Sequence, residues 1–310
     1  MKRVLISDSL ADYLAGESLP DDVNAELFGS DNLPAGDWIG VLPDITRRIG
    51  VEQIERLPAL RIIANYGVGY DNIDVAAARE RGIIVTNTPG VLTRATAELT
   101  WALILAVARR VGEGERELRA GRWTGWRPTH MRGFGLDGKI LGIVGPGRIG
   151  RDVARRAAAF GMQVIYWSRA RNQEIEADSD ARWLPLDTLL ETADVVSLHV
   201  ALTEETRGLI GEAELARMKR SAVLVNTARG PVVDEAALID ALKHRRIRGA
   251  GLDVYTHEPH VPAELRDLEN AVLLPHLGSA TDEARLAMWQ TAWKNLLCGI
   301  SGSPVPNPVY

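Results

Sequence analysis

The chain has 310 residues, of which 46% are hydrophobic and 25% charged, so it is long enough for one large or two medium cores, and we favour two domains. Its net charge is −5 and its 36 Lys and Arg residues are spread along the chain, which argues against a nucleic-acid or anionic-membrane surface. Cys298 is the only cysteine, which excludes an internal disulfide and a multi-cysteine zinc site and fits a reducing compartment. No apolar run approaches the roughly 18–20 residues of a membrane helix, and the N-terminal run ends at Ser7, too short for a signal peptide. We therefore expect a cytoplasmic protein that works on a small molecule without a metal.

Short apolar runs rich in Val, Ile and Leu alternate with helical patterns along the chain. The runs are nearly continuous in apolar residues, as in strands that helices cover on both faces. Strands that alternate with helices over this length predict an α/β fold with doubly wound parallel sheets. The predicted strands cover residues 3–7, 37–42, 60–66, 82–88, 139–145, 162–167, 194–200, 222–228, 249–255 and 271–276.

A buried connecting helix is predicted between the fourth and fifth strands, over residues 93–110, because helix formers fill the segment and apolar residues surround it. The next segment, 112–138, is polar and rich in glycine, and it holds Trp123 and Trp126 with no periodic pattern. A long irregular segment is usually functional or a partner surface. We prefer an arm that packs on another subunit, and a flap that folds back on its own domain stays open.

A glycine-rich turn joins the fifth predicted strand to an amphipathic helix. Gly145 permits the tight turn, Gly147 lets the backbone approach a pyrophosphate, and Gly150 allows close packing of the helix on the strand. The helix N-terminus then offers N–H groups and a positive dipole end to phosphates. The predicted dinucleotide-binding residues are Gly145, Pro146, Gly147, Arg148, Ile149 and Gly150.

The end of the next strand indicates which dinucleotide is preferred. An acid at that place would bind the ribose 2′-hydroxyl of NAD, but the chain has Ser168, Arg169 and Arg171 there and no acid. Guanidinium groups suit phosphate oxygens, so we expect NADP(H) to be preferred, with NAD(H) possible. The alternative is that the two arginines are solvated loop charges.

Three chemically distinct side chains follow the last three predicted strands. Arg229 comes after 222–228, Glu258 after 249–255 and His276 at the end of 271–276. In open α/β sheets, ligands bind beyond the carboxyl ends of the strands, so these side chains are expected at one edge together with the glycine turn.

The three residue types fit hydride transfer to a 2-keto acid. Arg229 is expected to hold the substrate carboxylate and polarise the ketone, because a guanidinium stays charged. His276 is expected to donate the proton that the ketone oxygen gains. Glu258 is expected to favour the protonated ring and to fix its orientation. His257 is the chain neighbour of Glu258, and we expect it to point away.

Four ordered motifs carry a family resemblance: GPGRIG, NTARGPVVDEAAL, GAGLDVYTHEP and LLPHLGSAT. With them, the chain from about residue 65 to its end resembles the D-isomer-specific 2-hydroxyacid dehydrogenases. Within that family, residues 95–128 and the stretch YWSRAR are most similar to the glyoxylate/hydroxypyruvate reductases. The first 60 or so residues match only in pattern.

The resemblance implies roles for further residues. The family's arginine, glutamate and histidine fall on the three residues already chosen. The substrate-carboxylate loop falls on YGVG, which implies the backbone amides of Val68 and Gly69. Asp253 corresponds to an aspartate that holds the nicotinamide carboxamide, and His199 lines the cofactor groove. Thr227 is a further candidate cofactor-binding residue.

The resemblance also implies the domain organisation. A flavodoxin-like substrate domain, residues 1–95 and 283–310, would contain an inserted Rossmann cofactor domain, residues 96–282. Segment 112–138 would be the arm of a homodimer, with Trp126 reaching a neighbour's substrate site. Closure of the cleft between the domains would exclude water.

Residues and resemblance together predict NADPH-dependent reduction of glyoxylate and hydroxypyruvate to glycolate and D-glycerate. A broader 2-keto acid reductase, for example for 2-ketogluconate or phenylpyruvate, stays open because the pocket residues fall in the N-terminal domain. A dinucleotide-sensing regulator without turnover is disfavoured, because Arg229, Glu258 and His276 are all present. A phosphoglycerate dehydrogenase is disfavoured because the cofactor strand lacks the acid and no regulatory domain is expected after Tyr310.

Overall fold

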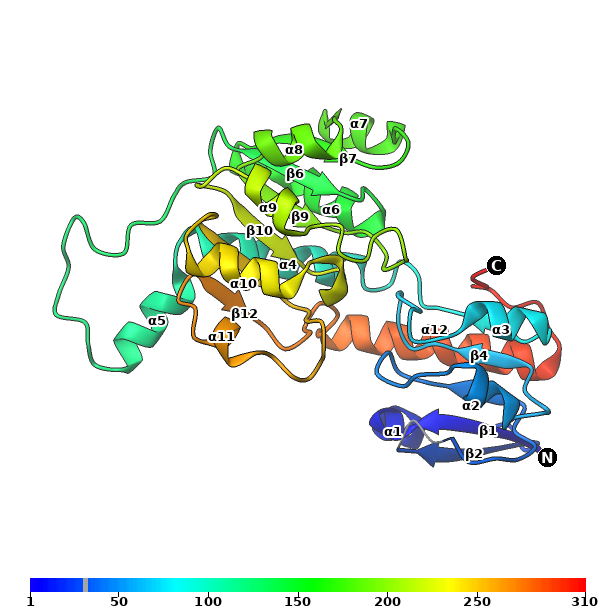
Figure 1. The fold of residues 1–310 in the computed structure, drawn as a ribbon. Helices are drawn as coiled ribbons and strands as arrows, with labels where there is room; N and C mark the ends of the chain where they lie inside the picture. The colour runs from blue at the N-terminus through cyan, green and yellow to red at the C-terminus, as the bar shows by residue number, and fades with distance from the viewer. Residues whose placement is uncertain (30–32) are drawn as a thin grey trace. The chain divides into compact units, whose positions relative to one another are not determined.

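The computed structural model describes residues 1–29 and 33–310 and separates the chain into two compact units (Figure 1). The first unit contains Met1–Leu92 and Ala280–Tyr310, and the second contains Thr93–Ser279. The last helix, red in Figure 1, therefore lies with the blue and cyan elements from the start of the chain.

The first unit is built on a five-stranded parallel sheet in the order β2-β1-β3-β4-β5, the flavodoxin-like order. Its strands are β1 (Lys2–Ser7), β2 (Val23–Phe28), β3 (Gly40–Leu42), β4 (Ile62–Ala64) and β5 (Ile84–Thr86). Its helices are α1 (Ala11–Ala15), α2 (Val51–Glu55), α3 (Val75–Glu80) and α12 (Asp282–Ser301).

Alternate strand residues fill the two faces of this sheet. Leu5, Val41 and Ile63 belong to one buried cluster with residues of α2 and α3. The opposite face packs on α12, which contacts β3, β4 and β5. A Cβ on Gly299 of that helix would collide with Ile62, so the glycine lets the helix lie close to the sheet.

The second unit is built on a seven-stranded parallel sheet in the order β12-β11-β10-β9-β6-β7-β8. This is the doubly wound order of a dinucleotide-binding sheet with one strand, β12, added at the edge. The strands are β6 (Ile140–Val144), β7 (Gln163–Trp167), β8 (Arg182–Trp183), β9 (Val195–Leu198), β10 (Val223–Asn226), β11 (Gly249–Leu252) and β12 (Ala271–Leu273). The helices are α4 (Thr93–Ala108), α5 (Val111–Arg119), α6 (Arg148–Ala157), α7 (Gln173–Ser179), α8 (Leu186–Thr192), α9 (Glu212–Arg217), α10 (Glu235–Lys243) and α11 (Ala263–Arg266).

Helices cover both faces of the second sheet, which explains why its strands read as continuous apolar runs. One buried cluster joins strand residues such as Val196 and Leu224 to α8, α9 and α10. The other joins Ile143 and Val225 to α4 and α6. The predicted α/β fold with two doubly wound parallel sheets is confirmed.

Two strands were not predicted, and one helix lies in a segment that was predicted to be irregular. Strand β2 is an edge strand of mixed polarity, and β8 has only two residues, so neither forms an apolar run. The segment 112–138 is not irregular throughout, because α5 occupies Val111–Arg119. The remainder forms the long loop beside α5 in Figure 1, on which the side chains of Trp123 and Trp126 are 53% and 82% exposed.

Trp101 couples α4 to α6. Its ring stacks on Phe160 at a centroid distance of 4.3 Å, and its indole N–H donates to the carbonyl of Val153 at 3.0 Å. We expect Trp101→Ala to lower the free energy of unfolding by about 3–5 kcal/mol, because it removes a buried aromatic ring. Trp101→Phe keeps a ring for the stack and is expected to cost roughly 1–2 kcal/mol. Urea denaturation measures both, and equal losses in the two variants would contradict the role of the stack.

Candidate active site

The glycine turn lies where the strand order of the second sheet reverses. Strands β6 and β9 are neighbours, yet the chain continues from β6 to one side and from β9 to the other. Gly145 has φ +92°, and a Cβ there would come within 2.7 Å of Val200 and 2.9 Å of the carbonyl carbon of His199. Gly150 packs so closely that a Cβ would lie 2.5 Å from the carbonyl oxygen of Gly145. In open α/β sheets, ligands bind beyond the carboxyl ends of the strands at this point of reversal.

Gly147 is the residue whose surroundings fit a bound pyrophosphate. It is the N-cap of α6, and a Cβ on it would meet no atom of the described chain within 4 Å. Its φ of −73° is open to any residue, so the fold itself does not demand glycine there. Open space at the N-terminus of a ten-residue helix suits a phosphate, which the helix N–H groups can bind.

The other residues of the turn have separate surroundings. Arg148 is exposed at the first position of α6, and Ile149 packs against the buried cluster below it. Pro146 is buried, and its carbonyl accepts a hydrogen bond from the side chain of Asn172 at 3.0 Å. Asn172 also caps α7, so it ties the glycine turn to the loop after β7.

The two arginines after β7 differ in their surroundings. Arg171 forms a two-pronged ion pair with Glu176, with both N···O distances at 3.0 Å. Arg169 is exposed, and its guanidinium makes no hydrogen bond or ion pair with a residue that the structure describes. Ser168 donates its hydroxyl to the carbonyl of Ala170 at 2.5 Å.

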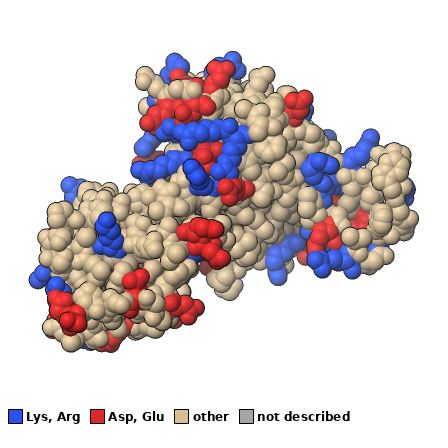
Figure 2. Space-filling view, turned by 180° about the vertical axis from the view of Figure 1, so that it is seen from behind, with Lys and Arg blue, Asp and Glu red and all other residues tan. Residues whose placement is uncertain are grey.

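Glu176 is anchored from two sides, because the hydroxyl of buried Tyr166 also donates to it. The hydrogen bonds from Arg171 and then from Tyr166 hold the pKa of Glu176 below its ordinary value. Further ion pairs join the arginines of α6 to Glu174 and Asp178 of α7. Basic and acidic side chains lie side by side in the upper part of Figure 2.

The structure brings Glu258 and His276 together. The Nδ1 atom of His276 lies 2.7 Å from Oε2 of Glu258, and Oε1 accepts the backbone N–H of Tyr255 at 3.0 Å. Burial by itself raises the pKa of Glu258. The hydrogen bond and the charge of His276 outweigh burial and hold that pKa below its ordinary range, and the charge of Arg229 acts in the same direction.

Close backbone packing places the exits of β10 and β11 side by side. A Cβ on Gly230 would collide with the carbonyl group of Tyr255, so only glycine allows this approach. The hydroxyl of Tyr255 in turn donates to the carbonyl of Leu274 at 2.9 Å, which links the exit of β11 to the end of β12. Arg229 immediately precedes Gly230 and is half-buried. Its Nη1 donates to the carbonyl of Ala228 at 3.0 Å.

Asp253 fixes the turn on which His276 stands. Its carbonyl accepts the N–H of His276 at 3.0 Å, and its carboxylate accepts the N–H groups of Leu277 at 2.6 Å and Gly278 at 2.8 Å. Burial raises the pKa of Asp253, partly offset by these N–H donors. His276 has φ +55°, an uncommon backbone conformation for a non-glycine residue, and these hydrogen bonds hold it there. A nicotinamide-binding role for Asp253 stays a prediction.

Within the part of the chain that the structure describes, the remaining predicted site residues share no hydrogen bond with the His276–Glu258 pair. His199 lies at the end of β9, with Nε2 at 2.8 Å from the hydroxyl of Ser197, and burial lowers its pKa to about 3, so the ring is neutral. Thr227 pairs its hydroxyl with that of Thr100 in α4 at 2.9 Å. Trp126 lies on the arm of the second unit and Val68 and Gly69 in a loop of the first. Sequence reasoning missed Glu176, Asn172 and Gly230, of which only Gly230, next to Arg229, had a signal in the sequence.

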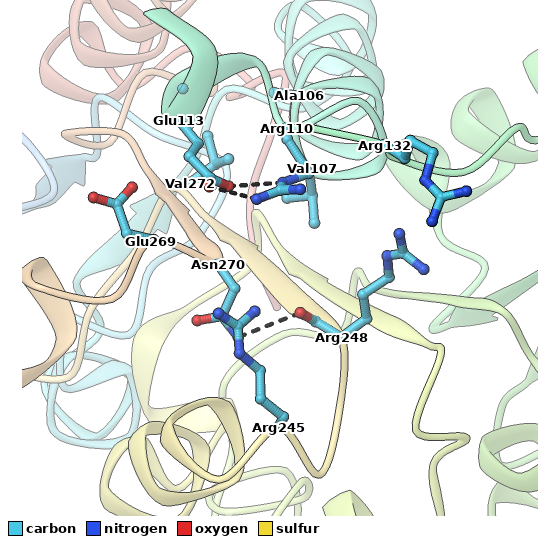
Figure 3. Close-up of a pocket in the computed structure, with 11 residues that line it drawn as sticks. Ala106, Val107, Arg110, Glu113, Arg132, Arg245, Arg248, Glu269, Asn270 and Val272 are labelled. Carbon is cyan, nitrogen blue, oxygen red and sulfur yellow. Dashed lines mark hydrogen bonds and ion pairs between the residues drawn. The ribbon is translucent and has the colours of Figure 1, made fainter. Parts of the chain in front are cut away.

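A separate cavity of about 220 Å³ lies at the amino ends of strands in the second sheet (Figure 3). Arg248 and Asn270, which line it, immediately precede β11 and β12, so the cavity is at the amino ends of these strands. Arg110 in its wall is paired with Glu113. The remaining arginines of the wall are Arg132 and Arg245. This basic cavity is therefore separate from the glycine turn and His276, which follow the carboxyl ends of β6 and β12.

Among residues 1–29 and 33–310, no group of three or more His, Cys, Asp or Glu side chains is arranged to hold a metal ion. Within the same ranges, no helix combines the length and hydropathy needed to cross a membrane.

Comparison with known proteins gives a consistent family. Residues 101–278 match the family model of the D-isomer specific 2-hydroxyacid dehydrogenase, NAD binding domain. The chain is 53% identical over 269 residues to glyoxylate reductase of Thermococcus litoralis. This alignment covers 86% of this chain and 81% of that protein. It is 52% identical over 267 residues to glyoxylate reductase of Korarchaeum cryptofilum, with coverage of 86% and 80%.

A solved structure agrees over almost the whole chain. The NADPH-dependent glyoxylate/hydroxypyruvate reductase from Sinorhizobium meliloti, in complex with NADP and malonate, aligns with a TM-score of 0.89 at 33% identity and covers 99% of this chain and 96% of that one. The sheet topology, the family model and these relatives lead to one conclusion: the chain belongs to the D-isomer-specific 2-hydroxyacid dehydrogenase family.

Proposed function

We propose that the protein is an NADPH-dependent reductase that converts glyoxylate and hydroxypyruvate to the corresponding D-2-hydroxy acids. The observation that carries the proposal is the His276–Glu258 pair beside Arg229, at the sheet edge that also holds the glycine turn. Relatives that are glyoxylate reductases at about half identity support the substrate class.

His276 is the proposed proton donor. Glu258 engages Nδ1, which leaves Nε2 to face the ketone oxygen. A reduced nicotinamide, when bound beside the glycine turn, would supply the hydride for the keto carbon. As negative charge develops on the oxygen, Nε2 releases its proton to it, and Glu258 stabilises the charged ring before the transfer. Arg229 supplies a fixed positive charge that polarises the ketone and binds the carboxylate.

NADP(H) is the proposed cofactor because a guanidinium is available at the end of β7. Arg169 is exposed and makes no hydrogen bond or ion pair among the described residues, so it can bind a 2′-phosphate without breaking one. Arg171 is held by Glu176 and would first have to exchange that carboxylate for a phosphate. The Sinorhizobium meliloti relative was solved with NADP.

We also propose a homodimer in which the arm 112–138 packs on a second copy, since Trp123 and Trp126 are exposed on it. Trp126 is the proposed contact with the neighbour's substrate. A cytoplasmic location and the domain roles, substrate for 1–95 with 283–310 and cofactor for 96–282, belong to the same proposal.

The direct test is a panel of 2-keto acids assayed with NADPH and NADH. We expect glyoxylate and hydroxypyruvate to give the highest kcat/KM, with NADPH preferred. Higher kcat/KM for 2-ketogluconate or phenylpyruvate would replace the substrate assignment by the broader reductase. Binding of cofactor without turnover of any 2-keto acid would indicate a dinucleotide-sensing regulator.

His276→Ala is expected to lower kcat by about a hundred- to ten-thousand-fold, because general acid catalysis has that magnitude. Binding of NADPH should change little, since the ring is not needed to hold the dinucleotide. The matched control is His257→Ala, because His257 is exposed and next to Glu258 in the chain. Steady-state kinetics and cofactor fluorescence measure the two effects, and normal turnover by the His276 variant would refute the assignment.

Glu258→Gln retains the size of the side chain but removes its charge. We expect kcat to fall by roughly ten- to a hundredfold, because a hydrogen bond to a charged group contributes about 1.5–3 kcal/mol. The loss should be smaller than that of His276→Ala, and the double variant should be no slower than His276→Ala alone. Additive losses in the double variant would mean that the two residues act independently.

Arg169→Ala is expected to raise KM for NADPH about tenfold or more and to leave KM for NADH unchanged, since only NADPH carries the 2′-phosphate. Arg155→Ala is the matched control, because Arg155 is an exposed arginine of α6 whose guanidinium pairs with Asp178. Glu176→Gln releases Arg171 from its ion pair and should lower KM for NADPH relative to the wild-type protein. Equal changes for both cofactors in the Arg169 variant would disprove 2′-phosphate recognition by this residue.

A further inference from the structure

Three successive carbonyl groups of the loop after β4 are each held by a separate donor. The carbonyl of Gly67 accepts the backbone N–H of Thr88 at 3.0 Å. The next carbonyl, of Val68, accepts the side-chain amide of Asn87 at 2.8 Å. The third, of Gly69, accepts the side-chain amide of Asn65, also at 2.8 Å. Three successive peptide units are therefore fixed in orientation.

Because peptide bonds are planar, the orientation of each carbonyl also sets the orientation of the next backbone N–H. In a trans peptide, the C=O of one residue points opposite to the N–H of the next. Fixing the carbonyls of residues 67, 68 and 69 therefore also fixes the directions of the N–H groups of Val68, Gly69 and Tyr70, each opposite to the carbonyl before it. Among residues 1–29, 33–92 and 280–310, none of these three N–H groups donates to a partner. Successive backbone N–H groups without a partner in the chain are donors that an anion can use.

The asparagines that hold the loop are themselves held. Asn65 is fully buried, and its side-chain oxygen accepts the amide of Asn72 at 3.2 Å, which leaves its nitrogen to face Gly69. The loop also presses against Ile45, because a Cβ on Gly67 would collide with that side chain. Asn65 and Ile45 therefore both restrict the position of the loop.

Asn87 is tied to the C-terminal part of the chain. Its carbonyl accepts the side-chain amide of Asn295 in α12 at 3.1 Å, and its N–H donates to the carbonyl of Asn307 at 3.3 Å. The side chains of Asn307 and Asn295 are joined at 3.1 Å. Asn295 is completely buried, so this chain of amides is rigidly placed by the packing of α12 on the sheet.

We propose that Asn65 and Asn87 are positioning residues that aim the N–H groups of Val68, Gly69 and Tyr70 at the carboxylate of the substrate. Tyr70 contributes a third donor beyond the two that the family resemblance implies. Asn295 and Asn307 set the position of Asn87, so the C-terminal tail takes part in substrate binding. This inference rests on the proposed function, because it takes the 2-keto acid carboxylate as the anion.

Loss of the amide donor of Asn87 should affect substrate binding more than turnover. Every 2-keto acid carries the same carboxylate, so loosening this loop should raise KM by a similar factor for all of them. Asn87→Ala is expected to raise KM for glyoxylate and for hydroxypyruvate about tenfold and to weaken inhibition by oxamate equally, with little change in kcat or in KM for NADPH. Asn87→Asp keeps the size but loses the donor, so it should behave at least as badly.

Asn270→Ala is the matched control. Asn270 also donates its side-chain amide to backbone carbonyls, those of Leu242 at 3.2 Å and Arg248 at 3.3 Å. It lies in the second unit, at the amino end of β12. Its loss should lower the melting temperature without a change in KM for glyoxylate. An Asn87→Ala protein that folds and keeps the wild-type KM overturns the inference, as does an equal rise of KM for NADPH.

Failure of the proposed function gives a different result. If the wild-type protein reduces no 2-keto acid, oxamate binding to the protein with NADPH, measured by calorimetry, still tests the loop. Weaker binding of oxamate by Asn87→Ala than by Asn270→Ala supports the inference. No binding of oxamate to the wild-type protein, or equal binding by both variants, overturns it.

Discussion

Parallel pairing of β10, β11 and β12 is the constraint on which the candidate site depends. In-register pairing brings Asn226 beside Leu252, and Leu252 beside Leu273, so the three strands end at one edge. Just past these three ends lie a cation, a carboxylate and an imidazole. Gly230 tightens the arrangement, because the absence of a Cβ lets the exit of β10 touch that of β11. The 2.7 Å contact of His276 with Glu258 is a consequence of this packing.

Both units use buried side chains to orient a backbone rather than to touch a ligand. In the second unit, the Asp253 carboxylate accepts two consecutive N–H groups and so holds the turn that carries His276. In the first, Asn65 and Asn87 donate to two consecutive carbonyls and so fix the directions of the N–H groups that follow them. A buried polar side chain must find partners, and satisfying it with loop backbone makes that loop rigid. Rigid placement of donors and acids is what a reaction with developing charge requires.

The loop after β7 shows how intramolecular ion pairs modify a binding motif. Two arginines separated by one residue look equivalent in the sequence, yet Glu176 and Tyr166 form a hydrogen-bonded cluster with Arg171 and leave Arg169 exposed. A phosphate can bind Arg169 without cost to existing bonds, whereas Arg171 must exchange one anion for another. The partner that distinguishes them, Glu176, lies in the next helix, which the arginine pattern alone does not reveal.

The sequence by itself determined the α/β class, ten of the strands, the glycine turn and the residues after the last three strands. Continuous apolar runs and a strand-turn-helix glycine motif are local signals, because each follows from which faces are buried and where a turn needs glycine. Edge strand β2, short β8 and helix α5 escaped because none forms such a run. Only the tertiary structure decided which groups meet: Glu258 with His276, Glu176 with Arg171, and Asn87 with Val68 across 19 residues. These contacts depend on how strand ends and loops pack in three dimensions. The distance between two residues along the chain does not reveal whether their side chains meet.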